Sequence, residues 1–133
     1  MSIFIDYPNK VFSNLSKDST MLIEASSNSL WINSIIVCNK GNQTIRFNLK
    51  LLKTQDTPAE SFLINELAIA PFKSINALEF LEKDSTSFKG GVLHLEYSTT
   101  PSISDSLVCF SNGATQIFDC TVNFTRLNEL PIA

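Results

Sequence analysis

The sequence predicts an all-β protein, an antiparallel β-sandwich of immunoglobulin-like or jelly-roll-like type with about eight or nine strands. Apolar and polar residues alternate with a period of two in several segments, and turn signals separate these segments at roughly ten-residue spacing. Ten phenylalanines among 133 residues supply bulky side chains for the layer between two facing sheets. The length fits a single domain over residues 1–133, with residues 1–30 as a candidate N-terminal arm.

Three short strand candidates lie in the first thirty residues. They are the apolar segments Ser2–Ile5, Val11–Phe12 and Met21–Glu24. The polar stretches Asp18-Ser19 and Ser26-Ser27 are typical of loops, because small polar residues compete with regular backbone pairing.

The next two segments predict a β-hairpin. Trp31–Cys38 is apolar and rich in β-branched residues, whereas Gln43–Leu52 alternates strictly, as in a strand with one wet face and one buried face. The apolar positions of that alternation are Ile45, Phe47, Leu49 and Leu51. Asn39–Asn42 between the two strands contains a glycine, which tolerates the positive φ of many turns. We therefore predict that these strands pair with each other.

The middle of the chain holds further candidates of differing clarity. Ser61–Ala70 predicts a strand that Asn65-Glu66 interrupts, and Val92–Tyr97 predicts a strand by its alternation. Ser74–Glu82 is compatible with a short amphipathic helix or an irregular strand, and we predict the strand. Thr99–Ser104 is polar and predicts a loop.

The C-terminal segments predict a second hairpin. Ser106–Phe110 and Thr115–Leu127 are strand candidates, and Ser111–Gly113 between them contains Asn-Gly, a strong turn signal. In the longer strand the inward set is Phe118, Cys120, Val122 and Phe124. Pairing of the two strands would bring Cys109 close to Cys120, and two packed, reduced thiols are favoured over a disulfide there.

Composition argues against several classes of protein. The net charge is −3, the pI is about 5.0, and the ten Lys and Arg are scattered singly, so the chain lacks the basic stripe that nucleic-acid binding needs. Neither a signal peptide nor an apolar run long enough to span a membrane is present in the sequence. The three cysteines form no CxxC pair, and we expect reduced thiols in a protein made and assembled in a cytoplasm.

The search for catalytic chemistry predicts no enzyme, no cofactor and no metal site. His94 is the only histidine, and a base–orienter pair with Glu96 is outweighed by a surface polar neighbour on a strand. Zinc and calcium sites need dense ligands, which this chain does not have. The remaining acids are dispersed and predict ordinary solvated groups: Glu79, Glu82, Asp105 and Asp119.

Trp31 is the one residue singled out as a possible interface or ligand platform. A carbohydrate-binding β-sandwich could use this tryptophan for stacking against a sugar. Trp31 leads directly into the most apolar strand, however, which favours a core or interface position. The sugar-binding module stays the alternative function.

The order of segments over residues 31–129 resembles small β-sandwich proteins of tailed bacteriophage virions, found in tail, fibre-attachment and head-decoration roles. The residues that carry the resemblance are Ile35–Asn39, Leu67–Pro71, Ile75–Leu81, Asp105–Phe110 and Val122–Glu129. The resemblance implies a virion structural protein of the tail or fibre-attachment region, assembled in the host cytoplasm without a cofactor. Its implied partners are copies of itself and neighbouring virion proteins, which dock through strands and arms.

Overall fold

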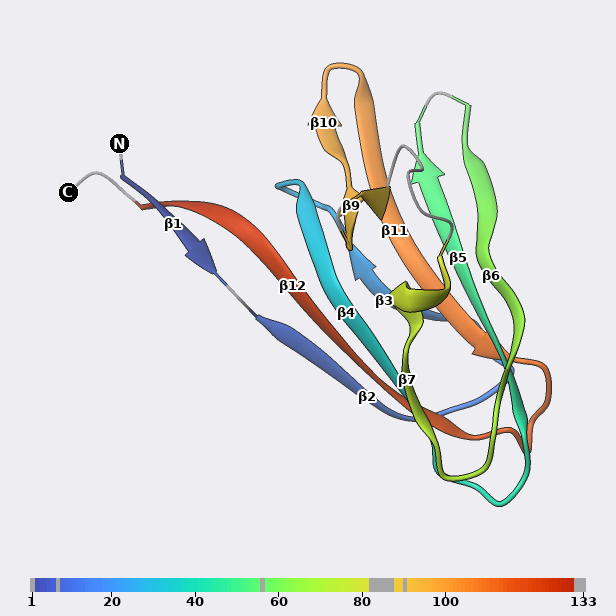
Figure 1. The fold of residues 1–133 in the computed structure, drawn as a ribbon. Coiled ribbons are helices and arrows are strands. Elements are labelled where there is room, and N and C mark those ends of the chain that lie inside the picture. Colours follow the sequence, from blue (N-terminus) through green and yellow to red (C-terminus); the bar gives the residue numbers. More distant parts are fainter. Residues whose placement is uncertain (1, 7, 56, 82–87, 90, 131–133) are drawn as a thin grey trace.

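The computed structural model describes residues 2–6, 8–55, 57–81, 88–89 and 91–130. In these residues, two antiparallel sheets pack face to face and the only helix is one short 3-10 turn (Figure 1). This architecture confirms the predicted all-β sandwich. The layer between the sheets holds one core of buried apolar side chains.

Within the described residues, one sheet has seven strands and the other has five. The seven-stranded sheet contains β1 (Ser2–Asp6), β2 (Asn9–Leu15), β4 (Leu30–Asn39), β7 (Ser74–Asn76), β8 (Phe88–Lys89), β9 (Val92–Leu95) and β12 (Phe118–Leu130). The five-stranded sheet contains β3 (Thr20–Glu24), β5 (Ile45–Thr54), β6 (Ala59–Ile69), β10 (Tyr97–Thr99) and β11 (Ser102–Ser111). The described residues contain more strands than the predicted eight or nine. The difference comes from β7, β8 and β10, which are only two or three residues long and leave no clear alternation in the sequence.

The strand order is that of a jelly roll. In the sandwich body, one sheet runs β2–β12–β4–β9 and the other runs β3–β11–β5–β6. Numbered along the chain, these eight strands have the orders 1-8-3-6 and 2-7-4-5, the paired Greek keys of that fold. The order therefore decides between the two predicted types of sandwich.

The predicted hairpin between residues 31–38 and 43–52 is wrong, although both strands are present. β4 pairs with β12, β9 and β7, whereas β5 pairs with β11 and β6 in the opposite sheet. The turn after Asn39 therefore carries the chain across the sandwich. A buried apolar face forms equally well when two strands face each other across a core and when they lie side by side, so alternation did not separate these cases.

The predicted C-terminal hairpin is wrong for the same reason. β11 lies in the five-stranded sheet and β12 lies in the seven-stranded sheet. The predicted inward set of β12 is nevertheless buried: Phe118, Cys120, Val122 and Phe124. Cys109 and Cys120 do meet, but they do so across the core between the sheets and not across a hairpin.

The remaining elements give mixed outcomes. β6 confirms the strand over residues 61–70, and Glu66 has a φ of 56° where the interruption was predicted. For Ser74–Glu82, the strand prediction holds only over Ser74–Asn76, because Ala77–Phe80 form the 3-10 helix; Glu82 lies outside the described residues. The predicted loop at 99–104 holds only for the turn at Thr100–Pro101, since β10 and β11 pair on either side of it, with Thr99 opposite Ser102.

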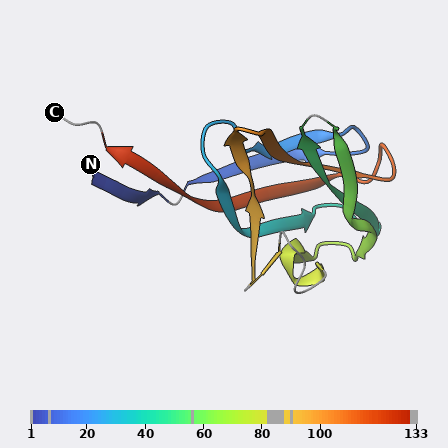
Figure 2. The same cartoon turned by 90° about the horizontal axis from the view of Figure 1, so that it is seen from above.

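The N-terminal segment divides between the body and a projection. β2 pairs with β12 and β3 pairs with β11, so both belong to the sandwich sheets. β1 pairs only with the last residues of β12, from Asp6 opposite Arg126 to Ser2 opposite Leu130. This two-stranded ribbon extends away from the sandwich (Figures 1 and 2). The arm expected over residues 1–30 thus corresponds in the structure to β1 alone.

Candidate assembly surfaces

The buried side-chain amide of Asn39 stabilises the connection from β4 to β5, where the chain passes from one sheet to the other. Asn39 is fully buried, and its Nδ2 lies 2.8 Å from the carbonyl oxygen of Gln43, 3.0 Å from that of Ile69 and 3.2 Å from that of Ala70. Its Oδ1 accepts a bond from the backbone N–H of Gly41 at 3.0 Å. One side chain therefore satisfies backbone groups of two connections and fixes how the two sheets join.

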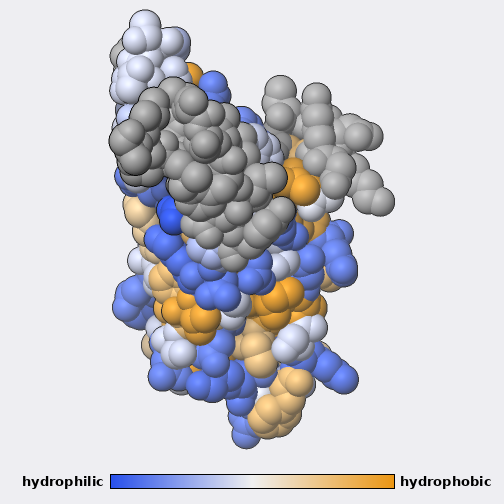
Figure 3. Space-filling view, turned by 90° about the vertical axis from the view of Figure 1, so that its left-hand side faces the viewer, coloured by the Kyte–Doolittle hydropathy of each residue, from blue (hydrophilic) through white to orange (hydrophobic). Residues whose placement is uncertain are grey.

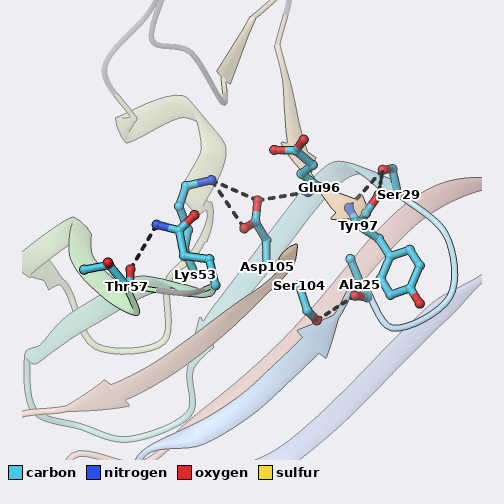
Figure 4. A network of polar contacts seen from close by, with 9 residues as sticks. Ala25, Ser29, Lys53, Thr57, Glu96, Tyr97, Ser104 and Asp105 are labelled. Carbon is cyan, nitrogen blue, oxygen red and sulfur yellow. Dashed lines mark hydrogen bonds and ion pairs between the residues drawn. The ribbon is translucent and has the colours of Figure 1, made fainter. Parts of the chain in front are cut away.

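A buried carboxylate holds the crossing from β9 to β10 (Figure 4). Asp105 is 1% exposed, and its Oδ2 lies 3.2 Å from Lys53 Nζ and accepts from the backbone N–H of Glu96 at 2.9 Å. Backbone bonds join Asp105 to Glu96 and to Ala25. The chain changes sheets at Glu96, between β9 and β10, so the bonds from Asp105 to Glu96 tie this crossing to the five-stranded sheet, in which Lys53 and Asp105 lie opposite each other on β5 and β11.

A third polar cluster shapes the outer edge of the five-stranded sheet. Asn48 Oδ1 accepts from the backbone N–H of Glu66 at 2.9 Å, where β6 bulges, and Asn48 Nδ2 donates to Asn112 Oδ1 at 2.7 Å. Asn112 in turn bonds the carboxylate of Glu66. These hydrogen bonds stabilise the bulge in β6. A bulge helps to keep an edge strand from pairing with other chains.

The outer face of the five-stranded sheet carries a line of side chains across four strands, which we call the Phe62 row. The pairing register places Met21 opposite Val108, Val108 opposite Lys50 and Lys50 opposite Phe62. Met21 is 49% exposed and Phe62 is 48% exposed, although both are large and apolar. The two ends of the row therefore expose apolar surface, whereas Val108 within it is buried.

A single cation lies in the middle of this row. Lys50 Nζ is 4.8 Å from the ring centroid of Phe62 and 5.7 Å from that of Phe110, close enough for cation–π attraction to both rings. It also pairs with Glu60 at 3.3 Å. The Phe62 row thus combines apolar surface with one ion pair.

The outer face of the seven-stranded sheet carries a matching line, which we call the Val11 row. The register places Val11 opposite Thr121 and Thr121 opposite Ile36. Val11 is 67% exposed and Ile36 is 37% exposed. Figure 3 views the molecule from the side of β1, β2 and β12 and shows apolar areas among hydrophilic ones.

Trp31 lies on this same outer face, at the end nearer the ribbon. Its register partners are His94 on β9 and Thr125 on β12, and its ring packs on that of His94 with centroids 5.4 Å apart. Both rings are half-buried. Asn33 donates to Thr125 Oγ1 at 2.6 Å nearby. Trp31 is therefore neither a core residue nor an open platform.

Three of the residues considered for catalysis, Asp105, Asp119 and His94, have other partners in the structure. Asp105 is committed to the Lys53 pair, and Asp119 pairs with Lys40 at 3.5 Å and accepts from the backbone N–H of Asn14. His94 packs on Trp31. Among the described residues, no group of three or more His, Cys, Asp and Glu side chains could hold a metal ion.

The buried thiol of Cys109 is kept protonated. A hydrogen bond with Cys120 raises the pKa of Cys109 far above its ordinary value, and burial raises it further. Both cysteines are free thiols in the core. A protonated, buried thiol is a poor nucleophile, which gives Cys109 a packing role.

Within the described residues, no helix is both long and apolar enough to cross a membrane.

Solved structures from virus particles share this fold. A chain of the T13 particle of infectious bursal disease virus matches with a TM-score of 0.51 and 10% identity, over 94% of this chain and 30% of that chain. T=1 particles derived from infectious bursal virus match with a TM-score of 0.52 and 9% identity, over 95% and 31%. The VP2 subviral particle matches with a TM-score of 0.51 and 10% identity, over 95% and 32%.

These likenesses show a common fold, because the identities are too low to carry more. The chain spans about a third of the length of the chains it matches. The matched structures come from an animal virus, not from a tailed phage, so they agree with the predicted resemblance only in its broader form of a viral β-sandwich. No protein-family model matches the sequence, and no curated protein matches it.

Sequence reasoning did not find the two apolar rows. Val11, Ile36 and Phe62 each look like ordinary strand residues in the sequence, because an alternating strand with one apolar outward residue is common. The rows exist only because non-adjacent strands align these residues in register. Runs such as Ile35-Ile36-Val37, apolar on both faces of a strand, were the only local signal.

Proposed function

We propose that this protein is a structural subunit of a virus particle that acts by protein–protein assembly. The observation that carries the proposal is the jelly-roll sandwich with apolar side chains on both outer faces. Jelly rolls occur in viral capsid and lectin domains, and the matched structures are of virus particles. No catalytic step, cofactor, nucleic acid or membrane is part of the proposal.

The narrower form of the proposal places the protein in the tail or fibre-attachment region of a tailed phage. The order of short segments over residues 31–129 supports this narrower form. The projecting β1–β12 ribbon suits docking onto neighbouring virion proteins, because strand edges readily add the strands of other chains.

The test is the composition of particles purified from the virus that encodes this chain. We expect quantitative mass spectrometry to find the protein at a fixed copy number that survives high-salt washing. Immunogold labelling then separates the narrower forms, since label at a tail or fibre base supports the phage-tail placement and label over the shell contradicts it. Particles that lack the protein would overturn the proposal.

Carbohydrate binding is the second candidate, favoured by the position of Trp31 on an outer face beside His94, Asn33 and Thr125. Aromatic rings flanked by neutral polar groups are suited to sugars. Adding a series of glycans to the protein while Trp31 fluorescence is followed tests for sugar binding. The Trp31→Phe variant is the control that loses the signal. Saturable quenching supports the sugar site, and an unresponsive emission rejects it.

A further inference from the structure

The turn between β11 and β12 contains the only Asn-Gly pair in the sequence, Asn112-Gly113. Asn112 is exposed, and Gly113 is partly exposed. Most backbone N–H groups of a folded protein are paired. The N–H of Gly113, however, donates no hydrogen bond to any residue that the structure describes, and glycine has no side chain that would shield it. The nitrogen that follows Asn112 is therefore available for reaction.

An amide side chain beside such a nitrogen can lose ammonia without an enzyme. The Gly113 nitrogen gives its proton to hydroxide and attacks Cγ of Asn112, and a C–N bond forms as the Cγ–Nδ2 bond breaks. The departing group takes a proton from water and leaves as ammonia, and a cyclic succinimide remains. Water then opens the ring at either carbonyl carbon and leaves aspartate or isoaspartate at position 112. In total, one water is consumed and one ammonia is released, with no oxidation or reduction.

The side chain of Asn112 belongs to the polar cluster at the bulge of β6. Its Oδ1 accepts from Asn48 Nδ2 at 2.7 Å, and its Nδ2 donates to the carboxylate of Glu66. Glu66 has a φ of 56°, and its backbone N–H donates to Asn48 Oδ1 at 2.9 Å. The Asn112 amide therefore supplies a donor to the carboxylate at the bulge.

We infer that Asn112 is a site of spontaneous deamidation and that the product loosens the bulge of β6. Deamidation replaces the Nδ2 donor with a carboxylate oxygen, so a second negative charge lies against Glu66. Two carboxylates in one site repel each other. The isoaspartate product also lengthens the backbone of the turn by a methylene group.

The loosened bulge has a consequence for the sheet, because β6 is its outer strand. The register between β5 and β6 shifts on either side of Leu49, next to Asn48. An edge strand whose bulge is weakened pairs more readily with a strand of another chain. Modified copies are therefore expected to have a less protected edge than newly made ones.

The first experiment follows the folded, full-length protein at mildly alkaline pH by peptide mass spectrometry. The folded protein is used because the bonds to Asn48 and Glu66 restrict the amide group. We expect deamidation at Asn112 before any other asparagine, with isoaspartate among the products as evidence of the succinimide route. Asn42 is the internal comparison, since it is also exposed in a turn between the sheets but is followed by Gln43.

Gly113→Ala is the matched control. A Cβ at this position would lie 3.3 Å from Nε2 of Gln116, the movable end of a side chain, and the backbone there is not left-handed. The variant should therefore fold. The added methyl group hinders attack by the nitrogen, so we expect modification at Asn112 to be lost over the same period.

The second experiment measures hydrogen exchange of the Glu66 amide. In Asn112→Asp, which has the charge of the product, we expect exchange about three- to tenfold faster than in the wild type. Glu66→Gln added to this variant should restore the wild-type rate, because the glutamine amide can donate to the new carboxylate. If circular dichroism shows that Asn112→Asp is unfolded, deamidated wild type separated by anion exchange takes its place.

Four results would overturn the inference. They are another asparagine that reacts first, a Gly113→Ala variant that deamidates as fast as the wild type, an Asn112→Asp variant with unchanged exchange at Glu66, and a double variant in which Glu66→Gln restores nothing. None of these results bears on the particle-composition experiment, because the modification does not depend on the proposed assembly role.

Discussion

At the scale of single residues, the buried polar side chains lie where the chain changes sheets or bends. Asn39 and Ser111 are buried at the ends of strands that lead from one sheet to the other, and buried Asp105 bonds to Glu96, where the chain passes from β9 to β10. Backbone groups at such crossings leave the ladders and need other partners. A side chain that supplies them fixes the crossing, and its loss leaves several groups unsatisfied at once.

Replacement of Asn39 by alanine is expected to lower the free energy of unfolding by about 2–3 kcal/mol, because the carbonyl groups of Gln43 and Ile69 lose a buried donor. Urea denaturation followed by tryptophan fluorescence measures the loss. Asn42→Ala in the same turn is the control, since Asn42 is exposed and its loss should cost less than about 0.5 kcal/mol. Equal effects at the two positions would contradict the role of the Asn39 amide.

The raised pKa of Cys109 makes a prediction about pH. The unfolded chain releases this proton near pH 9.0, whereas the native state keeps it, so native stability falls as pH rises above that value. Relative to Cys109→Val, the wild type is expected to lose up to about 1.4 kcal/mol per pH unit. Urea titrations at pH 7, 9 and 10 measure this difference. A constant difference across the series would refute it.

At the scale of elements, the Lys53–Asp105 pair joins β5 to β11 at the point where the chain passes from β9 to β10. A buried ion pair adds little over an apolar pair, but removal of one partner leaves a buried charge uncompensated. The pair therefore connects β5 to β11 specifically, and the loss of either partner alone lowers the stability of the fold.

Asp105→Ala is expected to cost about 3 kcal/mol of unfolding free energy, and Lys53→Met is expected to cost less because Lys53 is partly exposed. The loss of unfolding free energy in the double variant should be smaller than the sum of the two single losses by about 1–3 kcal/mol. Denaturant unfolding of the wild type, the two single variants and the double variant gives the four free energies of this double-mutant cycle. Lys40→Met, which breaks the surface pair with Asp119, is the control and should cost less than about 1 kcal/mol. Additive losses at Lys53 and Asp105 would show that the pair does not couple the elements.

At the scale of the whole molecule, the two sheets are joined by aromatic packing in the core. Phe47 on β5 and Phe118 on β12 belong to opposite sheets, and their rings meet edge to face with centroids 5.5 Å apart. Both are fully buried. Other phenylalanines of the ten lie on the surface, including Phe62, Phe72 and Phe80, so the abundance of phenylalanine served outer faces as well as the predicted core.

Phe47→Ala and Phe118→Ala are each expected to lower the free energy of unfolding by about 3–5 kcal/mol, because apolar burial is lost and a cavity is left behind. The double variant should show a coupling of about 0.5–1.5 kcal/mol, because the edge-to-face contact is lost only once. Thermal unfolding by calorimetry measures all three. Phe72→Ala is the size-matched control and should change stability by less than about 0.5 kcal/mol. Losses that simply add would argue against direct packing between the sheets.

Local patterns were sufficient for the class of fold and for most strands. The alternation of Ile45, Phe47, Leu49 and Leu51 reports which face of a strand is buried, and the structure buries all four. The same holds for the inward residues of β12. For the candidate sites, Trp31 was identified from residue type, while its packing on His94 depended on the pairing of β4 with β9.

By itself, the sequence determined an all-β sandwich, the positions of its main strands and the residues of its core, because these follow from side-chain periodicity along each strand. Only the tertiary structure decided which strands pair. The turns after Asn39 and Ser111 look like hairpin turns, yet they cross the sandwich, because β12 pairs with β4 and β11 pairs with β5. Those pairings also align the Phe62 and Val11 rows, and register between distant strands is set by the packing of the whole core and not by any one segment.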